Sequence, residues 1–165
     1  MKELKRISEQ DAIYLAGFFD GEGCVGIYQR SAGNSGPGAK NPNISALLSI
    51  CNTNFAVLQH IVNSCGGWVT TLPRKCAPKL NGGARQKQWR WSAGPRETAH
   101  ILAAILPYLI VKRDQAELAL QFHRSVLEYM HRPHPGHNGK PALTKEEVQR
   151  RFALADKMKA MKRQD

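Results

Sequence analysis

The sequence predicts an α+β fold in which helices cover one face of a four-stranded antiparallel sheet. Three patterns lead to this prediction: an apolar helical run near the N-terminus, two pairs of strand-like segments, and a helical pattern after each pair. The predicted order is helix, strand, strand, helix, strand, strand and then helices (αββαββα and beyond). A chain of 165 residues is long enough for such a domain to bury its own core.

The first helix is predicted over residues 8–20, in a stretch that continues from Asp11 as DAIYLAGFFDGEGCVG. Ser8 and Asp11 form a capping box at its start. We expect Gly21 or Gly23 to end it, because glycine adopts the positive φ found after many helices.

Two acids, Asp20 and Glu22, stand at the end of this helix, interleaved with glycines. A helix C-terminus attracts cations and repels carboxylates, so these acids indicate a functional role rather than a stabilising one. Gly17 and Gly21 lie four residues apart beside Ala16, a spacing that lets a second helix backbone approach closely. Two such helices in contact would bring their acidic ends together.

The first hairpin is predicted from strands over residues 24–30 and 44–52, joined by a loop over residues 31–43 that is rich in Gly, Ser, Asn and Pro. The second hairpin is predicted from residues 68–74 and 85–93. Along its last strand, Trp89, Trp91 and Ala93 share the face expected in the core. The other face, free to meet a partner, carries Gln86, Gln88, Arg90 and Ser92.

Three further helices are predicted before the C-terminal segment. The helix over residues 54–65 has Thr53 or Asn52 as its expected N-cap and ends at Gly66-Gly67. Another spans residues 96–106 and ends at Pro107. The longest spans residues 113–131, and its expected buried stripe comprises Ala116, Ala119, Leu120, Val126, Leu127 and Met130.

The chain is predicted to divide into a core over residues 1–131, a linker over 132–143 and a basic helix within 144–165. Thr144 and Glu147 form the capping box of this helix. We expect it to dock on the core through Val148, Phe152, Ala155 and Met158, or to lie along phosphate groups. Prolines interrupt the histidines His131, His134 and His137, so no metal site is predicted there.

The charge balance indicates a polyanionic partner. The chain has 24 Lys and Arg against 13 Asp and Glu, a net charge of +11 and a pI of about 9.8. The four cysteines (Cys24, Cys51, Cys65 and Cys76) lack paired C-x-x-C spacing, which predicts buried free thiols in a reducing compartment. With no signal-peptide core and no run of eighteen apolar residues, we expect the protein in the cytoplasm of a bacterium or phage host, or inside an organelle that encodes it, rather than secreted.

Residues 15–23, LAGFFDGEG, resemble the motif that names the LAGLIDADG homing endonucleases. The order of elements over residues 8–130 also resembles one subunit of that family. The resemblance implies a saddle-shaped sheet whose strands read DNA bases in the major groove. It also implies site-specific hydrolysis of both strands across the minor groove, which leaves short 3′ overhangs.

The resemblance also implies the residues of the active site. The acid before the last glycine of the motif ligates the metal in the family, and here it is Glu22. Asp20 is assigned to the helix interface or to a polar cap. Its less favoured role is that of an additional metal ligand. Lys112, in the segment PYLIVKRDQA, matches a lysine of the active-site water network, with Arg113 as its competitor. Asn52 either orients water or caps the next helix. The implied metal is Mg²⁺, with Mn²⁺ as a substitute and Ca²⁺ binding without cleavage.

The chain carries one motif, and single-motif members of the family act as homodimers on palindromic or pseudo-palindromic sites. The expected dimer interface comprises Ala16, Gly17, Phe19, Asp20 and Gly21. The expected DNA-binding residues, each of which could equally be part of a solvated strand face, are Tyr28, Arg30, Ser45, Ser49, Thr70, Arg74, Gln86, Gln88, Arg90 and Arg113.

Two other functions fit the same scaffold. One is an intron maturase that binds RNA, and the other is a non-catalytic DNA-binding regulator. The pairing of Glu22 with Lys112 favours the nuclease, because a protein that only binds nucleic acid does not need a carboxylate facing phosphate.

Overall fold

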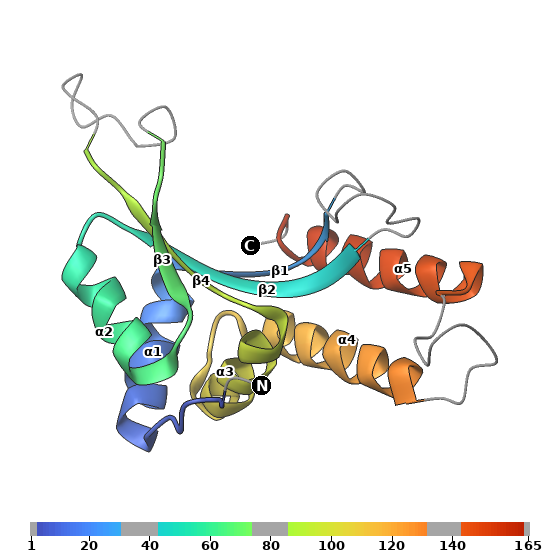
Figure 1. The fold of residues 1–165 in the computed structure, drawn as a ribbon, viewed down its shortest axis with the longest axis horizontal. Coiled ribbons are helices and arrows are strands. Elements are labelled where there is room, and N and C mark those ends of the chain that lie inside the picture. The colour runs from blue at the N-terminus through green and yellow to red at the C-terminus, as the bar shows by residue number, and fades with distance from the viewer. Residues whose placement is uncertain (1–2, 31–42, 74–85, 132–142, 164–165) are drawn as a thin grey trace.

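The computed structural model describes residues 3–30, 43–73, 86–131 and 143–163 (Figure 1). Four antiparallel strands form one sheet in the order β1-β2-β4-β3, and helices α1 to α4 lie on one side of it. The elements are α1 (Glu9–Glu22), β1 (Gly23–Arg30), β2 (Asn43–Asn52), α2 (Phe55–Cys65), β3 (Trp68–Thr71), β4 (Trp89–Ala93), α3 (Pro95–Ile105), a 3-10 turn η3 (Leu106–Tyr108), α4 (Arg113–His131) and α5 (Lys145–Met161). The predicted α+β fold with an antiparallel four-stranded sheet is confirmed.

The core lies between the helices and the inner face of the sheet. Val25 pairs with Leu48, and Ile50 pairs with Trp91, so these four side chains point to the same side and are fully buried. The Trp91 indole nitrogen donates a hydrogen bond to the Gly66 carbonyl at 2.9 Å, which satisfies its polar group inside the core. A shift of one residue in this register would turn the apolar set to the other face.

The end of α1 differs from the prediction. The helix continues to Glu22, and Gly23 follows with an extended backbone (φ −79°) instead of a positive φ. Glycine is needed there for a different reason, because a Cβ at Gly23 would overlap the Phe19 ring. Among the described glycines, positive φ occurs at Gly66 (89°) and Gly67 (80°), where the expected end of α2 is confirmed.

Two other local predictions were wrong. The N-cap of α2 is Asn54, whose side chain accepts from the N–H groups of Ala56 and Val57. On α4, Leu127 and Met130 are 40% and 57% exposed, so they are not part of the buried stripe. That stripe also contains the side chains Gln115, Leu118, Phe122, Ser125 and Tyr129.

The second hairpin is shorter than predicted. The strand expected over residues 85–93 begins at Trp89, and the Leu72 N–H donates to the Gln88 carbonyl at 2.9 Å as a last rung. Arg74, most of the expected loop over residues 31–43, and Cys76 lie outside the described residues. The three described cysteines are free, but Cys24 and Cys51 are only half-buried, against the predicted burial.

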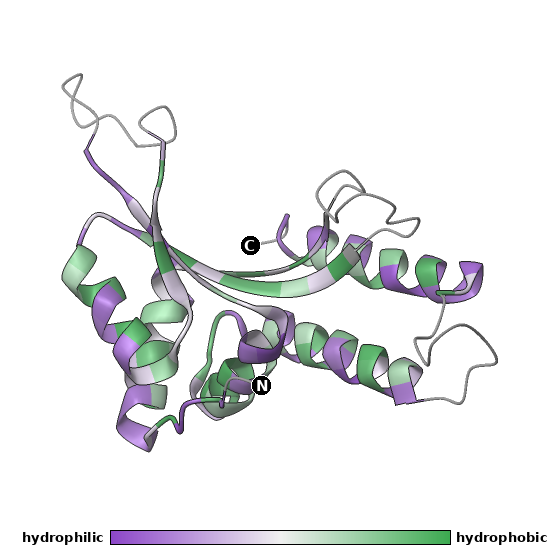
Figure 2. Cartoon of the chain, in the orientation of Figure 1, coloured by the Kyte–Doolittle hydropathy of each residue, from purple (hydrophilic) through white to green (hydrophobic). Residues whose placement is uncertain are grey.

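Helix α5 packs against α4 and against β1, the edge strand of the sheet. Ala155 and Met158 join the core, and hydrophobic and hydrophilic residues alternate along the helix, as Figure 2 shows. Of the two positions expected for this helix, the structure therefore shows it docked. None of the described helices is long and apolar enough to cross a membrane.

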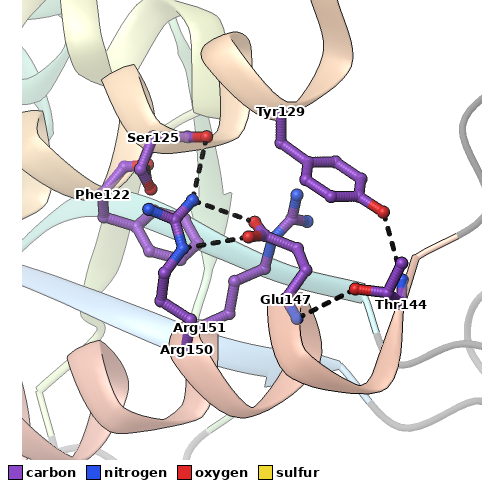
Figure 3. A network of polar contacts seen from close by, with 7 residues as sticks. All are labelled: Phe122, Ser125, Tyr129, Thr144, Glu147, Arg150 and Arg151. Atoms are coloured by element: carbon purple, nitrogen blue, oxygen red, sulfur yellow. Dashed lines mark hydrogen bonds and ion pairs between the residues drawn. The ribbon is translucent and has the colours of Figure 1, made fainter. Parts of the chain in front are cut away.

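A buried ion-pair network fixes the start of α5 (Figure 3). The Glu147 carboxylate is only 6% exposed and accepts from Arg151 Nε at 2.8 Å and from Arg150 Nε at 2.9 Å. Arg150 also donates to the Ser125 carbonyl of α4, and the Thr144 N–H donates to the Tyr129 hydroxyl. Burial opposes ionisation, but the two guanidinium groups outweigh it and hold the pKa of Glu147 below its ordinary value.

We predict that Glu147→Gln lowers the free energy of unfolding by about 3 kcal/mol, because the nearly buried Arg151 loses its counter-charge. Since the folded-state pKa is depressed, the wild-type contribution is complete above the unfolded pKa and disappears as the pH falls through the folded pKa. Chemical denaturation at neutral and acidic pH measures both effects. Asp156→Asn, at an exposed ion pair on the same helix, is the control and should change stability little. Equal effects of the two variants would contradict the prediction.

Candidate functional site

The C-terminal end of α1 is locked to the segment before α4 by a reciprocal set of hydrogen bonds. The Asp20 carboxylate accepts from the backbone N–H of Ile110 at 2.8 Å and from that of Lys112 at 2.9 Å. In return, the Lys112 ammonium donates to the carbonyls of Phe19, at 3.1 Å, and Asp20. The last turn of α1 has no basic residue of its own, so Lys112 supplies the cation that a helix C-terminus favours. We call this arrangement the Asp20–Lys112 clamp.

The clamp gives Asp20 the cap role expected from the sequence. Burial opposes its ionisation, but the backbone N–H groups of Ile110, Lys112 and Val111 outweigh this effect, so the pKa of Asp20 lies below its ordinary value. Both carboxylate oxygens accept a backbone hydrogen bond. The role of Asp20 as a metal ligand stays a prediction.

Glu22 is the last residue of α1 and is solvent-exposed. Within the part of the chain that the structure describes, its carboxylate forms no hydrogen bond or ion pair, and no group of three or more His, Cys, Asp or Glu side chains gathers into a metal site. A hard divalent cation such as Mg²⁺ takes oxygen ligands, keeps several waters and is often held by one or two carboxylates together with substrate phosphates. By donor type and exposure, Glu22 fits such an ion if further ligands come from outside the chain.

Asn52 ends β2, and the pairing of Gly23 with Ile50 places this end of the strand beside the end of α1. Its Oδ1 accepts the Asn54 N–H at 2.7 Å and so shapes the turn before α2. Arg113, the competitor of Lys112, begins α4 and forms an ion pair with Glu117 at 3.3 Å. The structure therefore brings Lys112, rather than the Arg113 guanidinium, into contact with the end of α1.

The outer face of the sheet, which points away from α1 to α4, carries several of the residues expected to bind DNA. Strand alternation places Tyr28, Ser49, Thr70 and Arg90 on this face, and Gln88 continues it just before β4. Ser45 is on the same face but only 9% exposed, which leaves it little surface for contact. Gln86 is exposed ahead of β4, and Arg113 is not on a strand but is the first residue of α4. Arg30 ends β1, and Arg74 is outside the described residues.

Sequence reasoning missed Lys162. From the end of α5, its ammonium donates to Cys24 Sγ at 3.0 Å and to the Tyr28 hydroxyl at 3.5 Å, and it lies 5.5 Å from the centre of the Tyr28 ring. Burial opposes ionisation of Cys24, but Tyr28 and Lys162 outweigh it and lower the pKa of the thiol. Lys162 and Tyr28 are 134 residues apart in sequence, so only the docking of α5 reveals this contact.

Comparison with solved structures identifies the fold. No family model and no curated protein matches the sequence. The homing endonuclease I-CvuI, solved in complex with DNA targets, superposes with a TM-score of 0.65 at 23% identity over 93% of this chain and 83% of that chain. The archaeal intron-encoded homing endonuclease I-Vdi141I, also complexed with DNA, superposes with a TM-score of 0.54 at 16% identity, over 92% of this chain and 98% of that chain. The LAGLIDADG homing endonuclease I-SmaMI, bound to cleaved DNA, superposes with a TM-score of 0.62 at 14% identity, over 95% of this chain and 46% of that chain.

The chain has the LAGLIDADG homing endonuclease fold. The predicted family resemblance is thereby confirmed at the level of structure, and α1 is the helix that carries the motif. Two of the solved proteins are matched over most of their length, whereas this chain corresponds to about half of I-SmaMI.

The exposed side of the LAGLIDADG helix differs from the predicted interface. Ala16 and Phe19, expected between two subunits, are 0% exposed and packed in the core of their own chain, so their placement was wrong. Gly17 and Gly21 are exposed, and a Cβ added at either would meet nothing within 4 Å. The same side presents Ile13 at 50% exposure. Next to the end of the helix, the clamp holds Ile110 and Val111 with 86% and 63% of their surface exposed.

We predict that Asp20→Asn loosens the clamp, because an amide offers one acceptor oxygen where the carboxylate offers two. One of the N–H groups of Ile110 and Lys112 then loses its partner, and the free energy of unfolding falls by about 1–3 kcal/mol. Amide hydrogen exchange at these two positions should accelerate, while exchange at the start of α5, around Glu147, stays unchanged. Protection of both amides at the wild-type level would show that Asp20 does not hold this segment.

Proposed function

We propose that this protein is a site-specific DNA endonuclease of the homing type. It binds a long palindromic or pseudo-palindromic duplex as a homodimer and hydrolyses both strands across the minor groove, leaving short 3′ overhangs. The observation that carries the proposal is Glu22, an exposed carboxylate without a partner among the described residues, held at the end of a clamped helix.

Charge and shape support a duplex DNA partner. The net charge of +11 favours a polyanion, and a β-ribbon such as the β3–β4 hairpin fits the width of the major groove. On the outer face, the exposed Arg90 offers donors for guanine, and Ser49 and Thr70 offer hydroxyl groups that pair with either donors or acceptors. Lys162 adds a cation beside β1. I-CvuI and I-Vdi141I, which share the fold, were solved in complex with DNA.

Phosphodiester hydrolysis needs a group that stabilises negative charge on the phosphoryl oxygens. A divalent ion, Mg²⁺ or in its place Mn²⁺, supplies this stabilisation and lowers the pKa of water, and Ca²⁺ is expected to bind without supporting cleavage. Glu22 would hold the ion together with DNA phosphates and the second subunit. I-CvuI was solved with DNA in the presence of Mg, with the DNA not cleaved, and with its target in the presence of Ca, which is consistent with the use of a divalent metal.

The remaining residues of the site have separate roles in this proposal. Lys112 uses two of its three N–H donors on the carbonyls of α1, and the third is directed to charge that develops on the phosphate. Asn52, at the neighbouring end of β2, orients water through its amide. Asp20 keeps the segment that carries Lys112 in place.

The homodimer is supported by the surface of α1. A helix that is apolar on both sides is stable when both sides are covered, yet in the single chain Ile13, Tyr14 and Gly17 face solvent. A second copy of α1 would cover them and bring two Glu22 carboxylates together, one for each DNA strand. The chain also corresponds to about half of I-SmaMI, as one of two similar halves would.

We predict that Glu22→Gln reduces double-strand cleavage at least about a hundredfold and leaves DNA affinity unchanged or higher, because the ion loses its carboxylate while the basic contacts remain. Single-turnover cleavage in Mg²⁺ measures the reaction, with a plasmid that carries the host sequence without its intron or intein as the substrate. Glu117→Gln removes an exposed carboxylate on α4 and should cut normally. Normal cleavage by Glu22→Gln would overturn the assignment of the metal ligand.

The same assay separates the alternative functions. Tight, sequence-specific binding of DNA by wild type with no cleavage in Mg²⁺ or Mn²⁺ would indicate a regulator. Preference for structured intron RNA over duplex DNA would indicate a maturase.

We predict that Gly17→Leu weakens the dimer while the subunit still folds. Nothing lies within 4 Å of a Cβ at Gly17 in the single chain, so a side chain there is compatible with the fold of the subunit and would project toward the proposed second subunit. Overpacking there should weaken dimerisation about 10- to 100-fold and eliminate double-strand cleavage. Sedimentation with and without a palindromic duplex measures the state of association, and circular dichroism measures folding. Ala153→Leu, a similar change at an exposed position of α5, is the control. A monomeric wild type that cuts both strands would contradict the dimer.

A further inference from the structure

A hollow of about 480 Å³ lies on the outer face of the sheet. It is open to solvent and spans all four strands, from β1 at one edge to β3 at the other. Its lining includes side chains from the outer face of each strand: Cys24, Tyr28, Leu47, Ser49, Cys51, Trp68, Arg90 and Ser92. In the proposed function, this surface meets the major groove of a DNA half-site.

The floor of the hollow is mostly apolar. Leu47 and the two half-buried thiols form its middle, and Trp68 is 45% exposed at one side. At the other side Tyr28 is 43% exposed, and a Cβ at Gly26 would lie 2.5 Å from its ring. The ring therefore lies flat along β1, over the glycine, instead of projecting outward. Hydrogen-bonding side chains are confined to Ser49, Ser92 and the borders.

Two cations border this floor, and each contacts one of its thiols. Arg90 Nε donates to Cys51 Sγ at 3.4 Å, and Lys162 Nζ donates to Cys24 Sγ at 3.0 Å. The thiols are thus engaged by protein groups, and the surface they leave toward the hollow is sulfur and carbon. The positive charges at the border draw the DNA backbone toward the hollow, while the floor offers apolar contact.

The major-groove edge of DNA presents one apolar group among its donors and acceptors, the C5-methyl group of thymine. We propose that the hollow reads thymine methyl groups, so that Leu47 with Cys24, Cys51 and Trp68 selects T·A pairs at the centre of the surface covered by each subunit. This inference rests on the proposed function, since it requires the sheet to lie in the major groove. 5-Methylcytosine carries the same methyl group at the same place, and the experiment distinguishes the two.

The test begins with wild-type protein and a randomised duplex library, from which the preferred site is selected by binding in Ca²⁺. Each thymine of that site is then replaced by deoxyuridine, which removes only the methyl group. We expect the dissociation constant to rise about fourfold at one or two positions per half-site, the factor that burial of one methyl-sized group supplies. At other positions, deoxyuridine should bind like thymine. Substituting 5-methylcytosine or cytosine at the sensitive positions shows whether the methyl group alone suffices or thymine is required.

The variant Leu47→Asn should lose the discrimination against deoxyuridine at the sensitive positions. Leu127→Asn makes the same change at an exposed position of α4, away from the sheet, and should keep the discrimination. If Leu47→Asn does not fold, the deoxyuridine scan on wild-type protein still tests the methyl readout.

The outcomes separate this inference from the proposed function. If wild-type protein enriches no duplex sequence, the proposed DNA-binding function fails, and the methyl readout fails with it. If a site is selected and every deoxyuridine duplex binds as tightly as its thymine counterpart, the function stands and the methyl readout is overturned. If deoxyuridine at the sensitive positions lowers the affinity of Leu47→Asn as much as it lowers that of the wild type, the role of the hollow is also overturned.

Discussion

The architecture of the candidate site depends on the exchange of hydrogen bonds between α1 and the segment before α4. An acid at a helix C-terminus is unfavourable by itself, and an ammonium group in a partly buried position needs acceptors. Here each charged side chain forms hydrogen bonds with the backbone of the other segment. Asp20 accepts from N–H groups, and Lys112 donates to carbonyls. Because the two segments are 92 residues apart in sequence, this contact fixes the end of α1 relative to the helical layer and, through Gly23, relative to the first rung of the sheet.

The clamp also explains how Glu22 can remain without a partner among the residues that the structure describes. In the last turn, the Phe19 carbonyl accepts from the Gly23 N–H and from Lys112, and the Asp20 carbonyl accepts from Lys112, so this end of the helix is stabilised without the Glu22 side chain. The position of Glu22 is therefore free for chemistry. A change at Lys112 acts on two properties at once, since the same ammonium stabilises the helix end and faces the proposed reaction.

The sequence could predict those structural features that residues close together in the chain determine. The N-caps Ser8 and Thr144, the glycines after α2 and the alternation along β4 are local, and the structure confirms them. The predicted capping boxes are only half formed, because the Thr144 N–H donates to the Tyr129 hydroxyl and the Asp11 carboxylate accepts from the Ser8 hydroxyl. The side of α1 that is buried could not be predicted, because the helix is apolar all round and periodicity favours no side. This is why Ala16 and Phe19 were assigned to an interface although they lie in the core. Contacts such as Lys162 with Tyr28 depend on how α5 docks, which no local pattern contains.

The placement of α5 beside β1 has a consequence for association of the sheet. β1 is an edge strand of eight residues, long enough to pair with a strand from another molecule, whereas the opposite edge, β3, has only four. By packing along β1 and anchoring itself to α4 through Glu147, α5 obstructs the longer edge and leaves the shorter one exposed. With α5 packed along β1, less of the longer edge is open to edge-to-edge pairing with a strand of another molecule.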